Sequence, residues 1–192
     1  MIMDKITFRK ICLARLKRRK RVQNYKHDNE ANRRLYRYIQ LIEAKVVMLY
    51  LPLKIEVNIN PLIKKLRREG KVLLVPFMEG ESFSLVKYRL PLKIKKFGVK
   101  EPNKSNRYKR KIDLAIVPII GTDKTLRRVG FGKGFYDRFF EKNHKNIEKI
   151  LFVGREYCLA SEIITDDWDV KGEFYIAPKE PLLPRKARIK AP

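Results

Sequence analysis

Apolar residues along the chain alternate between helical spacing and short, largely unbroken runs, a pattern typical of helices that alternate with buried strands. Three such runs, at Val46–Leu51, Lys71–Pro76 and Asp113–Pro118, predict strands, and we expect the first and the third to be covered on both faces. Between the first two, Asn60-Pro61 predicts a helix that Asn60 caps and Gly70 ends. A strand, a helix and a second strand in this order indicate a parallel sheet.

Two further helices are predicted before the first strand. In Lys5–Arg21 the apolar residues Ile6, Leu13 and Leu16 recur at helical spacing, and Asp28–Ile42 begins at a cap supplied by Asp28 or Asn29. The same patterns predict three more strands and a helix, at Ser84–Lys87, Lys149–Val153, Phe174–Ala177 and Gly134–Lys142 respectively. Two stretches without such periodicity are expected to be loops, Leu90–Arg110 and Ile119–Lys133.

These elements predict a single three-layer α/β domain with a mainly parallel central sheet over residues 1–179. The chain of 192 residues is long enough for one domain, and its 44% hydrophobic residues suffice for a core. Residues 180–192 form a basic, proline-containing tail, for which we expect disorder.

Lysine and arginine number 46 against 21 acidic residues, which gives a formal net charge of +25. A field of that sign attracts polyanions such as nucleic acid, ATP or a folate with several glutamates, and charge alone does not choose among them. No run of about 18 apolar residues indicates a membrane span, and the basic N-terminus lacks the apolar run of a secretory signal, so we expect a cytoplasmic protein.

The two cysteines, Cys12 and Cys158, lie far apart and outside any CxxC pair. We therefore expect two separate thiols rather than a disulfide or a metal site. The histidines, His27 and His144, lie in polar surroundings, and no Ser-His-Asp or Cys-His set for nucleophilic catalysis is apparent.

Three glycines at alternate positions, Gly130, Gly132 and Gly134, follow a buried strand and lead into a helix. Glycine lets the backbone approach a ligand closely, and the start of a helix offers unpaired N–H groups and a positive dipole end. The segment therefore predicts a phosphate-binding loop, with further positive charge from Arg127, Arg128 and Lys133. Its spacing is neither a Walker A motif nor the dinucleotide GxGxxG, so a tight turn without a ligand is an equal alternative.

Asp137 lies in the first turn of the helix that follows this loop. A carboxylate there can favour the helix dipole, by about 0.3–1 kcal/mol, or it can hold a Mg²⁺ ion beside bound phosphates. The residue types alone favour neither interpretation.

The segment from Asp113 to Phe140 resembles the most recognisable motif of the 5-formyltetrahydrofolate cyclo-ligase family, also called 5,10-methenyltetrahydrofolate synthetases. The matching positions are Asp113, Leu114, Pro118, Asp123, Arg128, Gly130, Gly132, Gly134, Tyr136 and Asp137. The sequence departs from the motif at Ile119 and Leu126, where the family has glycine, at Thr122 for phenylalanine and at Val129 for leucine. Phe131 stands where some members carry arginine.

Four other segments match the family in the same order. Lys5 and Arg9 resemble its N-terminal ATP-binding pair, and Leu51 and Glu56 resemble a strand-end segment that contacts folate. Phe97 resembles an aromatic residue of the pterin pocket, and Asp169 a second carboxylate associated with magnesium, while Glu173 stands where the family usually has aspartate. From the residues alone, each has a plainer interpretation: a solvated basic face, a surface loop, packing under a loop and an acidic turn.

The resemblance implies an architecture related to sugar-phosphate isomerases and coenzyme A transferases. It also implies ATP-dependent cyclisation of 5-formyltetrahydrofolate to 5,10-methenyltetrahydrofolate, with release of ADP and phosphate and with ATP and Mg²⁺ as cofactors. The expected partner is a reduced folate, with or without a polyglutamate chain, and we expect a monomer or weak dimer without nucleic-acid or membrane partners. Two other functions stay open: a basic RNA-binding protein, and another ATP-dependent ligase or kinase.

The resemblance also assigns residues to roles. The expected catalytic residues are Lys133, Arg128 and Glu56. The expected nucleotide-binding residues are Lys5, Arg9, Arg128, Val129, Gly130, Phe131, Gly132, Lys133, Gly134, Phe135 and Tyr136. Folate is expected to contact Leu51, Glu56, Phe97, Phe131, Gly132, Lys133, Gly134 and Phe135. The expected metal ligands are Asp137 and Asp169.

Overall fold

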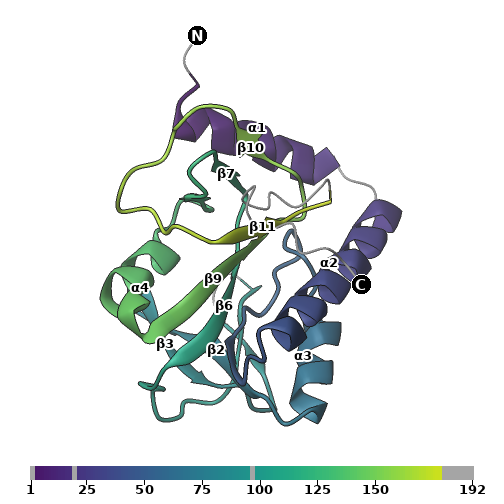
Figure 1. Ribbon diagram of the computed structural model, residues 1–192, viewed down its shortest axis with the longest axis vertical. Coiled ribbons are helices and arrows are strands. Elements are labelled where there is room, and N and C mark those ends of the chain that lie inside the picture. The colour runs from purple at the N-terminus through teal and green to yellow at the C-terminus, as the bar shows by residue number, and fades with distance from the viewer. Residues whose placement is uncertain (1–2, 19–20, 96–97, 179–192) are drawn as a thin grey trace.

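A six-stranded sheet runs through the middle of the molecule (Figure 1). The computed structural model describes residues 3–18, 21–95 and 98–178. The strand order is β11-β9-β6-β1-β2-β3, and every pair of neighbours is parallel except β2 and β3. A mainly parallel central sheet is thus confirmed. In chain order the strands of this sheet are β1 (Val46–Met48), β2 (Val72–Glu79), β3 (Ser82–Lys87), β6 (Ile112–Pro118), β9 (Ile147–Val153) and β11 (Phe174–Ile176).

Helices cover both faces of this sheet. On one face, α2 (Arg21–Leu41) and α3 (Asn60–Arg68) pack against a core that includes Leu114 and Ile116 of β6. On the other face, α4 (Phe135–Asn143), which continues into the 3-10 helix η2 (His144–Asn146), packs against a core that includes Ala115 and Val117. Since alternate residues of one strand enter different cores, β6 is buried on both sides, as its unbroken apolar run predicts.

A smaller sheet, β10-β7-β8, lies beyond the carboxyl ends of β6 and β9. Its strands are β7 (Gly121–Asp123), β8 (Arg128–Val129) and β10 (Leu159–Ala160). The expectation that Ile119–Lys133 is entirely a loop is therefore wrong. These strands gave no apolar signal because β7 and β8 bury polar side chains, among them Thr122, Asp123 and Arg128.

Helix α1 (Lys5–Arg18) packs over this small sheet (Figure 1). Its buried residues, Phe8, Cys12 and Leu16, recur every four positions along one face. The expectation that Ile6 belongs to the buried stripe is wrong, because Ile6 is 59% exposed. Two residues before Phe8, it lies about 200° around the helix from it.

Both predicted helix caps are wrong. Helix α2 begins at Arg21, so Asp28 and Asn29 lie inside it, and the Asp28 carboxylate accepts hydrogen bonds from Arg155 instead of capping. Helix α3 has Ile59 as its N-cap without a side-chain cap bond, although a proline does lie in its first turn as expected.

Within the predicted loop Leu90–Arg110, the two short strands β4 (Lys93–Ile94) and β5 (Lys100–Glu101) pair as an antiparallel ribbon. The remaining predicted strands and helices are present, with bounds that differ by a few residues. The predicted disordered tail, 180–192, lies outside the described residues.

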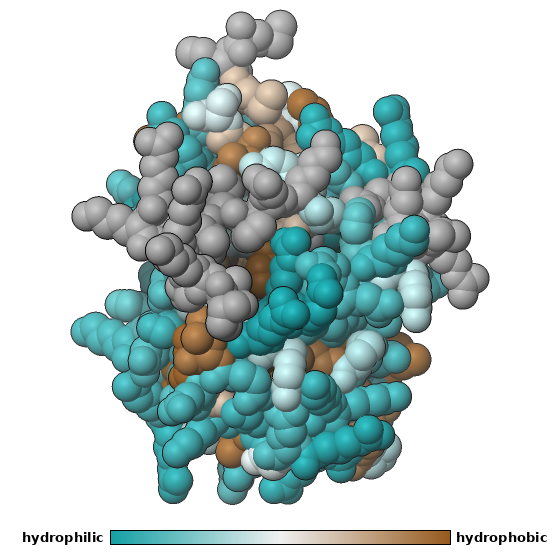
Figure 2. Space-filling view, turned by 45° about the vertical axis from the view of Figure 1, so that its right-hand side comes forward, coloured by the Kyte–Doolittle hydropathy of each residue, from teal (hydrophilic) through white to brown (hydrophobic). Residues whose placement is uncertain are grey.

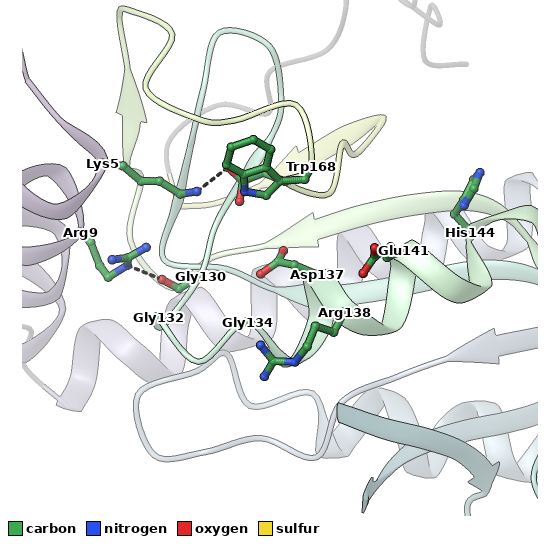
Figure 3. A pocket seen from close by; sticks show the side chains of 11 residues that line it. Lys5, Arg9, Gly130, Gly132, Gly134, Asp137, Arg138, Glu141, His144 and Trp168 are labelled. Atoms are coloured by element: carbon green, nitrogen blue, oxygen red, sulfur yellow. Dashed lines mark hydrogen bonds and ion pairs between the residues drawn. The ribbon is translucent and has the colours of Figure 1, made fainter. Parts of the chain in front are cut away.

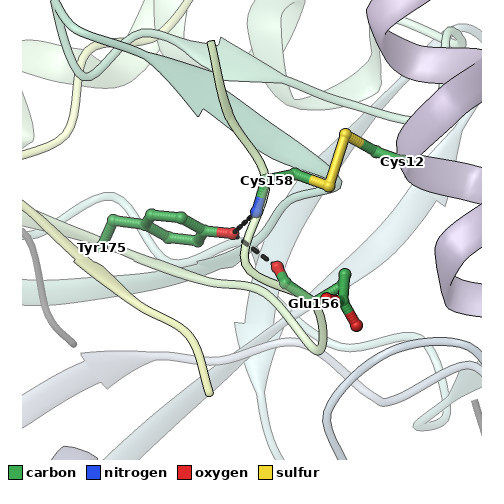
Figure 4. Close-up of a disulfide and its surroundings, with 4 residues drawn as sticks. All are labelled: Cys12, Glu156, Cys158 and Tyr175. Carbon is green, nitrogen blue, oxygen red and sulfur yellow. Dashed lines mark hydrogen bonds between the residues drawn. A yellow bond between two sulfur atoms is a disulfide. The ribbon is translucent and has the colours of Figure 1, made fainter. Parts of the chain in front are cut away.

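A disulfide joins Cys12 of α1 to Cys158, just before β10, across 146 residues of sequence (Figure 4). Their Cα atoms lie 6.1 Å apart, and both side chains are 1% exposed in the small core under α1. The backbone N–H of Cys158 donates to the Tyr175 hydroxyl at 3.3 Å, and that hydroxyl donates to the carbonyl of Glu156 at 2.7 Å. The expectation of two separate thiols is wrong, because the packing of α1 over the small sheet brings together cysteines that the sequence separates.

Opening this disulfide is expected to lower the free energy of unfolding by about 2–4 kcal/mol, because the cross-link restricts a long loop in the unfolded chain. Urea denaturation of the purified protein with and without reductant measures the difference. A variant with both Cys12→Ala and Cys158→Ala is the control, because it has no cross-link and its stability should not respond to reductant. Equal stability of the native chain in both conditions would contradict a stabilising role of the bond.

Candidate functional site

A cleft of about 670 Å³ lies between α1, the glycine loop, α4 and the turn at 166–169 (Figure 3). It lies on the side of the molecule where β6 and β9 end, the usual place for ligands in parallel α/β sheets. Residues distant in sequence line it: Lys5, Arg9, Gly130, Gly132, Gly134, Asp137, Arg138, Glu141, His144, Trp168 and Asp169.

The glycine loop runs from β8 into the first turn of α4. Gly132 and Gly134 adopt left-handed conformations, with φ of 89° and 66°, which side chains with a Cβ disfavour. Gly134 is the N-cap of α4 and has no side-chain cap bond, so backbone N–H groups at this helix start have no side-chain acceptor from the cap. This geometry suits an anionic ligand, whose oxygens accept from such groups.

Lys5 and Arg9 reach the cleft from one face of α1 (Figure 3). The Arg9 side chain donates from Nε to the carbonyl of Gly130 at 2.8 Å, which attaches α1 to the glycine loop. Lys5 Nζ donates to Asp166 Oδ2 at 3.1 Å and to Asp169 Oδ2. The structure therefore brings the N-terminal cations to the loop with which the sequence resemblance associates them.

Arg128 and Asp137, to which separate roles were assigned, form an ion pair. Arg128 Nη1 donates to both carboxylate oxygens of Asp137 at 2.9 Å, and the two side chains are 5% and 24% exposed. The Arg128 guanidinium also lies 5.0 Å from the ring centre of Tyr136. It fills the space beside Gly130, where a Cβ would meet its Nη2 at 2.1 Å. The loop backbone at Gly130 thus packs directly against the Arg128 guanidinium.

Asp169 is 7% exposed and accepts hydrogen bonds from Lys5 and, at 2.8 Å, from the backbone N–H of Asp166. Asp137 and Asp169 both line the cleft, so they fit Mg²⁺, which takes one or two carboxylates together with phosphate oxygens and water. Within residues 3–18, 21–95 and 98–178 there is no group of three or more His, Cys, Asp or Glu suited to hold a metal. Phosphate oxygens would therefore have to supply other ligands.

Glu56 lies in the turn that follows β1 and is 8% exposed. Burial raises the pKa of its carboxyl to about 7, against the hydrogen bond from Leu53 N–H at 2.8 Å and the charges of Arg128 and Arg155. Burial and this carboxylate also raise the pKa of the Tyr136 hydroxyl. Glu56 therefore interacts electrostatically with Arg128 and Tyr136, the residues on either side of the glycine loop.

Arg155 fixes the turn that carries Glu56, and sequence reasoning did not find it. Its Nη1 donates to the Lys54 carbonyl at 2.6 Å, and its Nη2 donates to both carboxylate oxygens of Asp28 at 2.9–3.0 Å. The pair is buried, with side chains 8% and 14% exposed. Arg155 therefore ties the Glu56 turn to helix α2.

The other predicted site residues differ in their exposure. Gly132 and Lys133 are exposed on the loop, while Phe135 and Tyr136 are partly buried against the core under α4. Val129 and Leu51 are buried. Phe97 lies outside the described residues.

Phe131 stands where some relatives carry a cation, and its ring packs against the small core around the disulfide. That core also contains Phe8 of α1, which explains an aromatic side chain at this position. Phe131 is thus a contact between the loop and the helix that carries Lys5 and Arg9.

Four residues that line the cleft were not among the predicted site residues: Arg138, Glu141, His144 and Trp168. Arg138 donates from Nη2 to the Lys133 carbonyl and from Nε to the Glu81 carbonyl, both at 2.7 Å, and so holds the glycine loop to the β2–β3 turn. Arg138 directly follows Asp137 in the segment that resembles the family motif, and this position was the sequence signal that could have identified it as a site residue.

Sequence comparison matches residues 2–173 to the model of the 5-formyltetrahydrofolate cyclo-ligase family. A probable 5-formyltetrahydrofolate cyclo-ligase of Schizosaccharomyces pombe is 30% identical over 156 residues, which cover 71% of this chain and 76% of the relative. The 5-formyltetrahydrofolate cyclo-ligase of Escherichia coli is 25% identical over 171 residues, covering 82% of this chain and 91% of the relative.

Comparison with solved structures agrees with the sequence comparison. The NMR structure of 5,10-methenyltetrahydrofolate synthetase from Aquifex aeolicus has a TM-score of 0.79 and 27% identity, covering 97% of this chain and 95% of that one. A 5,10-methenyltetrahydrofolate synthetase from Mycoplasma pneumoniae shares the fold, with a TM-score of 0.72 at 22% identity and coverage of 91% and 98%.

Proposed function

Because the chain belongs to the 5-formyltetrahydrofolate cyclo-ligase family, we propose that it catalyses the ATP-dependent cyclisation of 5-formyltetrahydrofolate to 5,10-methenyltetrahydrofolate, with release of ADP and phosphate. The observation that carries the proposal is the meeting of Lys5, Arg9 and the glycine loop at one cleft. These groups are suited to a triphosphate, whose charge needs several cations and backbone donors.

The reaction needs positioning and charge neutralisation more than a protein nucleophile. A formamide oxygen is a poor leaving group, and transfer of the γ-phosphoryl group to it creates a good one. N10 of the folate then attacks the activated carbon, and loss of phosphate gives the cyclic cation. Phosphoryl transfers of this kind depend on oriented reactants and on cations around the phosphates.

The backbone of Gly130–Gly134 is proposed to bind the phosphates. Lys5, Arg9 and Lys133 add positive charge, and Lys133 is exposed on the loop. Arg128 is proposed to act from beneath the loop, where its pairing with Asp137 fixes its guanidinium. These assignments follow the family resemblance and the places of the residues around the cleft.

Mg²⁺ is proposed to bind at Asp137 and Asp169, where it would neutralise charge on phosphate oxygens. Both carboxylates are already oriented, Asp137 by Arg128 and Asp169 by Lys5 and the Asp166 N–H. Partners of this kind hold a ligating carboxylate in one orientation.

The folate is proposed to lie on the side of the glycine loop where Glu56 and Tyr136 are found, with Leu51 and Phe97 as further contacts. A carboxyl group with a pKa of about 7 can donate or accept a hydrogen bond near neutral pH, so Glu56 is suited to hydrogen-bond the pterin or to orient the formyl group.

Replacing Glu56 by glutamine is expected to lower turnover while raising stability above pH 7. The folded-state pKa of Glu56 lies above its unfolded value, so this group favours folding fully below about pH 4.5 and loses that effect as the pH rises through about 7. Between pH 5 and 9 the native chain should therefore lose about 3 kcal/mol more stability than Glu56→Gln.

Urea denaturation across that pH range, with turnover measured at each pH, tests the pair of effects. Glu162→Gln is a matched control, because Glu162 is exposed and lies outside the cleft lining. Parallel stability curves for the native chain and Glu56→Gln would show that Glu56 is not a buried carboxyl of raised pKa.

We also propose a reduced folate, with or without a polyglutamate chain, as the partner, a monomer or weak dimer as the working form and the cytoplasm as its location. In the part of the chain that the structure describes, no helix has the length and apolarity needed to span a membrane. The proposed kinship with sugar-phosphate isomerase and coenzyme A transferase folds rests on the family resemblance.

Phosphate release tests the proposed coupling of ATP to folate. The purified chain, with ATP and Mg²⁺, should release phosphate when 5-formyltetrahydrofolate is added and not when it is omitted. Equal release without folate would indicate a different ATP-dependent activity. Strong, salt-dependent RNA binding without release would favour the RNA-binding alternative.

A further inference from the structure

Trp168 is an exposed aromatic side chain at the edge of the proposed phosphate-binding cleft. It is the single tryptophan of the chain, its side chain is 77% exposed, and it lines the cleft together with Lys5, Arg9 and Asp169. Figure 3 shows the indole ring among the side chains that line the cleft. A large indole exposed at this place is a candidate surface for a ligand ring.

The turn that carries Trp168 is fixed by its neighbours. Asp169 N–H donates to the Asp166 carbonyl at 3.0 Å, Asp166 N–H donates back to Asp169 Oδ2 at 2.8 Å, and Lys5 bonds to both carboxylates. On the other side, Arg127 Nη2 donates to Asp167 at 2.9 Å. Because the Asp167 side chain is 97% exposed, its pair contributes little, and the turn that carries Trp168 is held mainly by Lys5 and by the hydrogen bonds between Asp166 and Asp169.

A second set of bonds holds the segment before this turn. Asp123 Oδ2 accepts from the backbone N–H groups of Ile164 and Thr165, both at 3.1 Å, and from the Thr165 hydroxyl. Although burial opposes ionisation, the hydrogen bonds from Thr125 and Thr165 lower the pKa of Asp123 below its ordinary value. Because these bonds already order the backbone that carries the ring, stacking of a ligand costs little further backbone entropy.

We propose that Trp168 is the stacking surface for the base of the nucleotide whose phosphates bind at the glycine loop. The inference deepens the proposed function and rests on it. A pterin is also a flat ring, but its proposed contact, Glu56, is not among the residues that line this cleft, whereas the phosphate-binding groups are. Base–aromatic stacking tolerates different bases, so Trp168 would contribute affinity more than selection among nucleotides.

The single tryptophan provides a direct test, because all indole emission reports on this position. ATP with Mg²⁺ is expected to quench the emission, whereas inorganic tripolyphosphate should compete with ATP for the cleft without quenching. The reduced folate alone should leave the emission unchanged once its own absorbance is corrected. Quenching by tripolyphosphate as strong as by ATP would overturn the proposal.

Substitution of Trp168 provides a second test. Trp168→Ala is expected to weaken ATP binding, measured by calorimetry, about tenfold, the loss of one base–aromatic stack, while tripolyphosphate binding stays within about twofold. Trp168→Phe should retain most of the affinity, and Ile163→Ala, also exposed and in the same segment, is the matched control.

The two readouts separate this proposal from the proposed function. Because calorimetry needs no turnover, a chain without cyclo-ligase activity can still show the difference between ATP and tripolyphosphate. Unchanged ATP affinity in Trp168→Ala would overturn the stacking role even in an active enzyme. A raised KM for folate with an unchanged KM for ATP would assign the ring to the pterin and likewise overturn it.

Discussion

Replacing Asp137 by asparagine is expected to abolish ATP-dependent turnover and to lower the free energy of unfolding by about 3 kcal/mol. The loss of turnover follows from its proposed metal role. The loss of stability follows from Arg128, which is 5% exposed and would keep a buried charge without its carboxylate partner. Asp137 is therefore expected to support the fold as well as the proposed metal site.

Turnover and urea denaturation of the same Asp137→Asn preparation measure both effects. Asp167→Asn is the control, because Asp167 also pairs with an arginine but is 97% exposed, and surface pairs of this kind contribute little. Near-normal activity of Asp137→Asn would remove its metal role. Unchanged stability would show that the Arg128 pair does not support the fold.

Replacing Gly130 by alanine is expected to lower kcat/KM for ATP by at least about 100-fold, equivalent to roughly 3 kcal/mol. The added Cβ would lie 2.1–2.6 Å from three atoms of the Arg128 guanidinium. That guanidinium is buried and bonded to Asp137, so either the arginine leaves its carboxylate or the loop moves away from both.

The matched control is Gly80→Ala, in the turn between β2 and β3. Gly80 also has a positive φ, of 59°, but a Cβ there would meet nothing within 4 Å. It should cost about 1 kcal/mol of stability through backbone strain and leave turnover unchanged. Equal kinetics for the two alanine variants would contradict a specific role for the contact between Gly130 and Arg128.

Most of the main sheet could be predicted because its strands are buried on both faces. β1, β2, β6 and β9 carry apolar runs that few other structures explain. The small sheet β10-β7-β8 could not be predicted in this way, because it is short and its buried residues include Thr122 and Asp123. Such strands are stabilised by hydrogen bonds whose partners come from distant segments.

The candidate site, like the fold, could be predicted from the sequence only in part. The glycine loop and the pair Lys5 and Arg9 could be found from local patterns and family resemblance. The pairing of Arg128 with Asp137 gave no local signal, and neither did that of Arg155 with Asp28, because each depends on chain segments meeting in three dimensions. For the same reason the disulfide between Cys12 and Cys158 was not foreseen.

Many of the cations around the site form ion pairs with carboxylates of the protein itself. Several positive charges near the cleft are already paired, Lys5 with Asp166 and Asp169, Arg127 with Asp167 and Arg128 with Asp137. These pairs orient carboxylates and hold loops in place. The net charge of +25 is therefore not a measure of the charge available to a ligand.

An absorbance assay tests the central claim most directly, because methenyltetrahydrofolate absorbs in the near ultraviolet and formyltetrahydrofolate does not. The purified chain with 5-formyltetrahydrofolate, ATP and Mg²⁺ is predicted to give a rise in absorbance that is lost when ATP is omitted. No ATP-dependent rise from a folded preparation would contradict the assignment of this chain as an active cyclo-ligase.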